Sequence, residues 1–257
     1  MPSCLLLIAV IAQVAQSSPA EPVVAVWYRG TPAGTPRQDD LAAIRARGFT
    51  GVTWPAGQTT RVEELRRMAG SLGLAVTVQA APVPLTAVSA LTSADRVDVL
   101  VTRLAADEIP ALAWRAVAHG ARTIAFDSGS PAGAPLTDAD GRPLPWVAPA
   151  SAIARQLTFN ARLFLDARAG PRLAIQPPAP PGVEVVLLET GRAWMLIATN
   201  TSKVRATTVA ELPAAVPPAL WTSLLDGSGL SMLSRPSGPR WTFELAAGEA
   251  AIWVIDK

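Results

Sequence analysis

Apolar and polar positions follow two different periodicities along this chain, and the change falls near residue 175. Before it, short and nearly continuous apolar runs alternate with stretches of helical period. Such runs, buried on both faces, indicate parallel strands, and the helical stretches between them indicate βα units. The predicted strands cover residues 22–30, 50–55, 74–79, 97–103 and 122–129.

The helical stretches carry recognisable start and stop signals. Asp39 or Asp40 is the expected N-cap of the first helix, and Gly48 is its expected stop. The predicted helices cover residues 39–48, 62–72, 109–121 and 150–166, with a weaker candidate at 86–96. Five strands are too few for an eight-stranded barrel, so we expect a reduced (β/α) TIM-barrel-like domain over residues 21–172.

The C-terminal part has the alternation of an antiparallel sheet. A proline-rich segment, Gly170–Gly182, is the expected linker, and a β-sandwich is expected over residues 183–257. Trp241, Phe243 and Leu245 are the clearest alternating set, and DG and GSG turns break the strands. A sandwich of roughly 75 residues is near the lower size limit for independent folding, so we expect it to pack against the first domain.

The first 20 residues form a separate unit. CLLLIAVIAQVA is too short to span a bilayer comfortably, and Ser18-Pro19-Ala20 is a plausible cleavage site. We interpret residues 1–20 as a signal peptide, which predicts a secreted or periplasmic protein without membrane contact after cleavage. An uncleaved anchor is the alternative, because the first three residues lack a basic side chain.

The composition of the chain limits the partners, metal sites and cofactors that we expect. The net charge is only +2, and no basic run alternates with aromatic residues, so we expect no nucleic-acid partner. His119 is the only histidine, and Cys4 is the only cysteine and precedes the apolar run. We therefore expect no metal site, no disulfide and no cofactor. His119 stands just before Gly120, where a helix C-terminus favours a basic group.

Asp127 is the strongest candidate for chemistry. It lies at the C-terminal end of a predicted parallel strand, where α/β proteins place their active sites. The alternative is an aspartate that organises its loop by accepting hydrogen bonds from nearby backbone amides. Glu108 is the second candidate acid, although an acid at that position also complements a helix dipole.

Other strand ends carry side chains suited to a sugar. Aromatic rings stack on pyranose faces, and guanidinium groups donate to hydroxyls or carboxylates. The alternative for the aromatic residues is a place in the hydrophobic core. The candidate substrate-binding residues are Trp27, Tyr28, Arg29, Trp54 and Arg103.

Several motifs resemble clan A glycoside hydrolases of the β-galactosidase type. ALAWRAVAHGARTIAFDSG, then LTDADGRPLPW and a long helix, is similar to the closing units of such a barrel. MLIATNTS and LAAGEAAIWVI are similar to strands of the β-sandwich that follows many of these barrels. The resemblance covers most of the chain after residue 20 and implies a hydrolase-type barrel with a sandwich.

The resemblance also implies two catalytic glutamates at strand ends, and this chain departs from that pattern. The position of the nucleophile falls near Val101-Thr102-Arg103, where there is no glutamate, and the units for the acid/base are missing. We therefore expect a non-catalytic relative with a carbohydrate-binding or interaction role. The alternative is an active glycosidase that uses Asp127 with Glu108 or with an acid from a partner subunit. Open sheet edges also make a homo-oligomer plausible.

Overall fold

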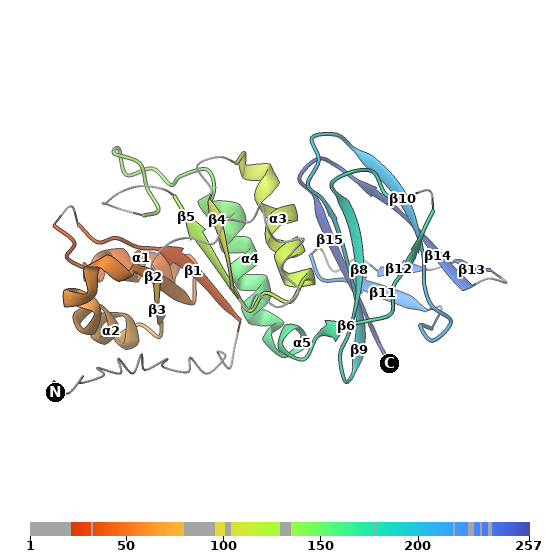
Figure 1. Cartoon of the computed structure of the whole chain (residues 1–257), viewed down its shortest axis with the longest axis horizontal. Helices are drawn as coiled ribbons and strands as arrows, with labels where there is room; N and C mark the ends of the chain where they lie inside the picture. The colour runs from red at the N-terminus through yellow and green to blue at the C-terminus, as the bar shows by residue number, and fades with distance from the viewer. Residues whose placement is uncertain are drawn as a thin grey trace, which may run out of the picture.

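The chain folds into a parallel α/β unit and an antiparallel β unit that lie side by side (Figure 1). A computed structural model describes residues 22–257 except 32, 80–95, 101–103, 129–134, 177, 218, 226–228, 232 and 236–237. For 58–60, 96–100 and the described residues of 229–239, only the backbone is described. The predicted leader at 1–20 lies outside the described residues. No helix in the described part is long and apolar enough to cross a membrane.

The first unit contains five parallel strands. They are β1 (Val23–Trp27), β2 (Gly51–Pro55), β3 (Ala75–Gln79), β4 (Arg96–Leu100) and β5 (Thr123–Asp127). Their order in the sheet is β3-β2-β1-β5-β4. The last strand therefore pairs with the first, with Val26 opposite Phe126. Read from β4, the order across the sheet is β4-β5-β1-β2-β3. Each strand is thus followed by the next one in the chain, with β5 followed by β1, as around a barrel.

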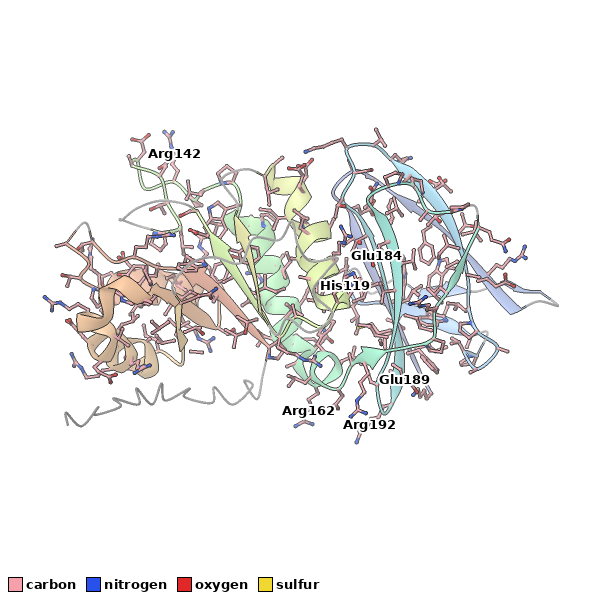
Figure 2. All side chains as sticks on the ribbon, viewed as in Figure 1. His119, Arg142, Arg162, Glu184, Glu189 and Arg192 are labelled. Atoms are coloured by element: carbon pink, nitrogen blue, oxygen red, sulfur yellow. The ribbon has the colours of Figure 1, made fainter. Side chains whose placement is uncertain are left out.

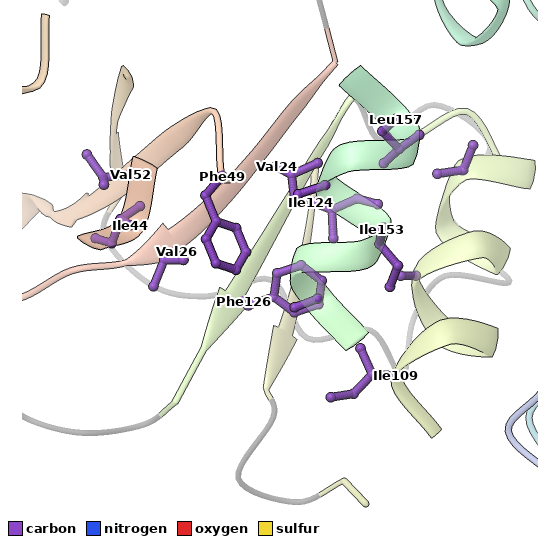
Figure 3. Close-up of a cluster of buried hydrophobic side chains, with 14 of the residues drawn as sticks. Val24, Val26, Ile44, Phe49, Val52, Ile109, Ile124, Phe126, Ile153 and Leu157 are labelled. Carbon is purple, nitrogen blue, oxygen red and sulfur yellow. The ribbon is translucent and has the colours of Figure 1, made fainter. Parts of the chain in front are cut away.

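The helices all pack on one face of this sheet. They are α1 (Gln38–Ala46), α2 (Val62–Ser71), α3 (Ile109–Ala118) and α4 (Val147–Phe159), and α4 continues into α5 (Ala161–Leu165). Val24, Val26 and Phe126 join the core formed with these helices (Figure 3). Ala25 and Trp27 belong to a separate small cluster, because successive strand side chains point to opposite faces.

Within the described residues the sheet is open, and no closed barrel is formed. β3 and β4 each have one hydrogen-bonded neighbour in the described part of the chain, so both are edge strands. The reduced strand number predicted from the sequence agrees with this mixed α/β architecture. The homo-oligomer that would cover the edges stays a prediction.

Several helix boundaries differ from the sequence prediction. The N-cap of α1 is Arg37, two or three residues earlier than predicted, so Asp39 and Asp40 lie in the first turn and complement the helix dipole. The long final helix ends at Phe159, because the Asn160 side chain donates to the Gln156 carbonyl and α5 begins after it.

The second unit is a sandwich of two antiparallel sheets. One has the order β12-β11-β15-β9-β8-β6 and the other β13-β14-β10-β7. The strands are β6 (Arg168–Ala169), β7 (Ala174–Ile175), β8 (Val183–Glu189), β9 (Ala193–Asn200), β10 (Ala206–Glu211), β11 (Leu220–Ser223), β12 (Gly229–Ser231), β13 (Leu233–Arg235), β14 (Gly238–Leu245) and β15 (Ala250–Asp256). The predicted linker thus contains β7, and it follows β6 directly; both short strands belong to the sandwich sheets.

Helix α3 joins the two units. Leu188, Met195 and Ile252 of the sandwich belong to the same hydrophobic core as the parallel sheet and its helices. At the start of α3, the Ala111 amide donates to the Gly248 carbonyl over 3.1 Å. Gly248 has a φ of +74°, and a Cβ there would lie 2.2 Å from the Asp107 carbonyl oxygen. Glycine is therefore required at this contact for two independent reasons.

We expect Gly248→Ala to lower the free energy of unfolding by about 3 kcal/mol, because it adds a backbone clash to a strained φ. Gly120→Ala introduces the backbone strain, since the φ of Gly120 is +92°, but no clash, because the space around it is open. It should lower the free energy of unfolding by about 1 kcal/mol. Gly191→Ala has neither and serves as the control. Equal effects of the three substitutions in denaturant titrations would contradict this account.

Candidate functional site

Arg29 and Asp127 form a bidentate ion pair at the C-terminal ends of β1 and β5. Arg29 Nη1 donates to Asp127 Oδ1 over 2.8 Å, and Nη2 donates to Oδ2 over 2.9 Å. The Asp127 side chain is 2% exposed and that of Arg29 is 19% exposed. Both oxygens of this carboxylate therefore accept charge-assisted hydrogen bonds inside the protein.

The strand order explains this pairing. β1 and β5 are neighbours in parallel register, and Arg29 and Trp27 alternate with the core residues Val26 and Tyr28. Arg29 therefore lies on the sheet face away from the helices, beside the end of β5. Its guanidinium carbon also lies 5.3 Å from the centre of the Trp27 ring, within the range of a cation–π contact.

Tyr28 and Trp54 lie on the opposite, helix-side face. Both side chains are fully buried, and their ring centres are 5.7 Å apart. The Tyr28 hydroxyl donates to Asp40 Oδ2 over 2.9 Å and accepts from the Arg37 amide over 2.7 Å. Burial, and then the bond to Asp40, raise the pKa of Tyr28 above its ordinary value. These two rings are core in this structure and are not accessible to a sugar.

The other residues predicted to bind a sugar differ in how exposed their side chains are. Trp27 is 2% exposed, which leaves little of its ring for stacking. Arg29 is the most accessible of the described candidates, although its guanidinium is committed to Asp127. Arg103 lies outside the described residues, together with the position at which the resemblance expects a nucleophile.

Glu108 contacts the sandwich. One of its carboxylate oxygens pairs with Lys203, and the other accepts from the Ala105 amide over 2.8 Å. The pairing with Lys203 contributes to the junction between α3 and the β-sandwich. Both carboxylate oxygens of Glu108 thus have partners within the fold, and its cooperation with Asp127 stays a prediction.

His119 has a partner that sequence reasoning missed. Its Nε2 lies 2.8 Å from Glu184 Oε1, and Arg115 Nε donates to Glu184 Oε2 over 2.9 Å (Figure 2). His119 is the C-cap residue of α3, as its place before Gly120 suggested. Glu184 is 65 residues away on β8, and no local pattern marks it. The cluster bridges the two units.

The described residues hold no metal site, and the cavity described here lies away from the C-terminal ends of the parallel strands. Within the described residues, no group of three or more His, Cys, Asp or Glu side chains is placed to hold a metal ion. A cavity of about 750 Å³ lies at the other end of the sheet, where Arg122, Arg168 and Lys257 line it together with Glu189.

Comparisons with known proteins give information about the fold of this chain. No protein-family model and no curated protein sequence matches the chain. It is similar to the solved structure of a maltogenic alpha-amylase from Thermotoga neapolitana, with a TM-score of 0.56 and 8% identity over 91% of this chain and 99% of that one.

Two other solved structures have lower scores. An alpha-amylase from Geobacillus thermoleovorans has a TM-score of 0.46 and 10% identity, over 84% of this chain and 62% of that one. A β-L-arabinopyranosidase from Geobacillus stearothermophilus has a TM-score of 0.44 and 10% identity, over 86% of this chain and 60% of that one. The chain spans about three fifths of these two proteins.

At such low identity, the likeness to the Thermotoga amylase concerns the fold alone. The chain therefore has a glycoside-hydrolase-like fold. The more specific β-galactosidase type, expected from the sequence motifs, stays a prediction.

We expect Asp127→Asn to lower the free energy of unfolding by about 3 kcal/mol, because it leaves the Arg29 guanidinium without its charged partner. Arg29→Met combined with Asp127→Leu should cost less than the single substitution, because it removes both charges. Denaturant titrations of the three proteins measure both effects. A single substitution without cost would show that the pair does not hold the two strand ends together.

Glu184 predicts a pH dependence of stability. The hydrogen bond with His119, together with the charges of His119 and Arg115, lowers the pKa of Glu184 from 4.5. The contribution is thus complete above about pH 4.5 and is lost as pH falls through the lowered pKa. We expect Glu184→Gln to cost about 1 kcal/mol at pH 7, since the cluster is partly exposed, and its unfolding free energy should converge with the wild-type value as the pH falls through the lowered pKa. A constant difference across this range would contradict the prediction.

Proposed function

We propose that this protein is a secreted, non-catalytic relative of glycoside hydrolases that uses the fold as a binding scaffold. The observation that carries the proposal is the Arg29–Asp127 ion pair. It occupies both oxygens of Asp127, which is the one carboxylate among the described C-terminal residues of the parallel strands and is 2% exposed. The apolar run and small-residue site within residues 1–20 support secretion.

Glycoside hydrolysis makes a demand that this arrangement does not meet. It ordinarily requires two carboxyl groups on either side of the scissile bond, about 5–5.5 Å apart in retaining enzymes and about 6.5–9.5 Å apart in inverting ones. Asp127 is enclosed, and Glu108 is engaged by Lys203 and by the Ala105 amide. This argues against hydrolysis by a single chain.

The exposure of the aromatic residues favours an interaction role over sugar binding. All eight tryptophans and the single tyrosine are buried, so the described part of the chain offers no indole platform for a pyranose ring. The accessible part of Arg29 is the feature at the strand ends that supports the carbohydrate alternative.

A panel of chromogenic α- and β-glycosides tests the absence of catalysis. We expect no hydrolysis by the wild-type chain, at either low or high protein concentration. Hydrolysis that Asp127→Asn or Glu108→Gln abolishes, assayed below the melting temperature of each variant, would overturn the proposal. Activity that rises steeply with protein concentration would point to an acid from a second subunit.

A screen of neutral and acidic oligosaccharides tests the ligand class. We expect no dissociation constant below about 1 mM, a value that corresponds to weak binding. A saccharide that binds more tightly and loses its affinity in Arg29→Gln, while the Arg142→Gln control retains it, would replace the interaction role with a carbohydrate-binding one.

A further inference from the structure

Charge is distributed unequally between the two ends of the parallel α/β unit. In such a unit the strand N-termini and the helix C-termini lie at one end, which we call the basic end. Exposed arginines gather there, and none forms an ion pair with a described residue: Arg45, Arg47, Arg155, Arg162 and Arg168. Two acidic residues lie beside them: Asp166, and Glu189, which stands opposite Arg168 in the β6–β8 pair and forms an ion pair with Lys257.

The opposite end, where the strands terminate, is acidic. Figure 2 shows Arg142 at this end and Arg162 at the other. Five arginines and Lys203 form ion pairs with carboxylates there, and the nine described acids outnumber these six bases. The acids are Asp39, Asp40, Glu63, Glu64, Asp107, Glu108, Asp127, Asp138 and Asp140.

The helix dipole explains part of this separation, because basic residues stabilise helix C-termini and acidic residues stabilise N-termini. It does not explain Arg168 on β6, which lies beyond the helices. Two observations place members of this group close to other residues of the same end. Arg155 Cγ lies 3.0 Å from the position of a Cβ built on Gly48, beside Arg47, and Arg168 lines the same cavity as Arg122.

An exposed aromatic ring lies within this surface. Phe159 is 89% exposed, and it shares a helix face with Arg155, four residues earlier. Arg162 follows in the next turn. An aromatic residue flanked by arginines is the composition of surfaces that lie at a membrane interface, where the ring enters the acyl boundary and the cations meet anionic headgroups.

The chain also enters the fold at this end. β1 begins at Val23, whose amide donates to the Arg122 carbonyl over 2.9 Å. Figure 1 shows the start of β1 close to the end of α4. Six residues separate the apolar run that ends at Ala15 from Pro22. If the run is retained as an uncleaved anchor, the seven residue steps from Ala15 to Pro22 span at most about 25 Å, so a bilayer that holds it lies within about 25 Å of the basic end.

We propose that the basic end, formed by Arg45, Arg47, Arg155, Phe159, Arg162 and Arg168, docks on an anionic lipid surface. The strand C-terminal ends then face away from the bilayer. This goes beyond the binding role proposed above, and it differs from the expectation that the processed chain has no membrane contact.

Flotation of the full-length chain with two kinds of vesicle tests the proposal: phosphatidylcholine alone, and phosphatidylcholine with about 30% phosphatidylglycerol. The ratio of the two partition coefficients cancels the contribution of the apolar N-terminal run. Each arginine near an anionic surface contributes about fivefold to partition. We therefore expect a wild-type ratio above ten, and a decrease of at least tenfold in Arg155→Glu/Arg162→Glu.

Matched controls separate this surface from net charge and from general hydrophobicity. Arg61→Glu/Arg142→Glu makes the same charge change at the acidic end and should keep the ratio within threefold. Phe159→Ser should weaken binding to anionic vesicles, and Leu220→Ser, which removes another exposed apolar side chain, should not. All of these side chains are exposed, and unchanged melting temperatures would show that the variants fold.

Three results would overturn the proposal. The wild-type chain could bind both vesicles equally, or the two arginine double variants could lose equal affinity. A soluble polyuronate could also bind the basic end regardless of Phe159 and displace the vesicles. That last result would identify an anionic polysaccharide as the partner.

Discussion

The parallel pairing of β1 with β5 is the constraint on which the rest of the molecule depends. It joins residues about one hundred positions apart, places Val26 opposite Phe126, and brings the end of the first strand beside the end of the last. Because both strands run in the same direction, Arg29 meets Asp127 at one end and Arg122 meets the start of β1 at the other. The ion pair, the acidic end and the basic end all follow from this neighbourhood.

The glycoside-hydrolase-like fold carries a buried Arg29–Asp127 ion pair at the C-terminal ends of two neighbouring parallel strands. The pair links two strands by charge-assisted hydrogen bonds, which is a structural role. A strand end of a familiar fold therefore does not identify an active site until the partners of its acid are known.

Local patterns predicted the strands, the helices and several of their ends, because these depend on near neighbours. Gly48 and Gly120 have the positive φ values expected after a helix. Partners distant in sequence were beyond such reasoning. Arg29 and Asp127 were each identified as candidates, but only the sheet order shows that they bind one another. Tyr28 and Trp54 were placed at strand ends correctly, yet the direction of their side chains depends on which face the helices cover.

The continuous core through α3 has a consequence for folding. The sandwich contributes Met195 and Ile252 to the core that also contains Val26 and Phe126. Separating the units would expose the apolar surface of α3 to water, a cost of roughly 25 cal/mol per Å². We therefore expect the two units to unfold together, in one cooperative transition with equal calorimetric and van't Hoff enthalpies.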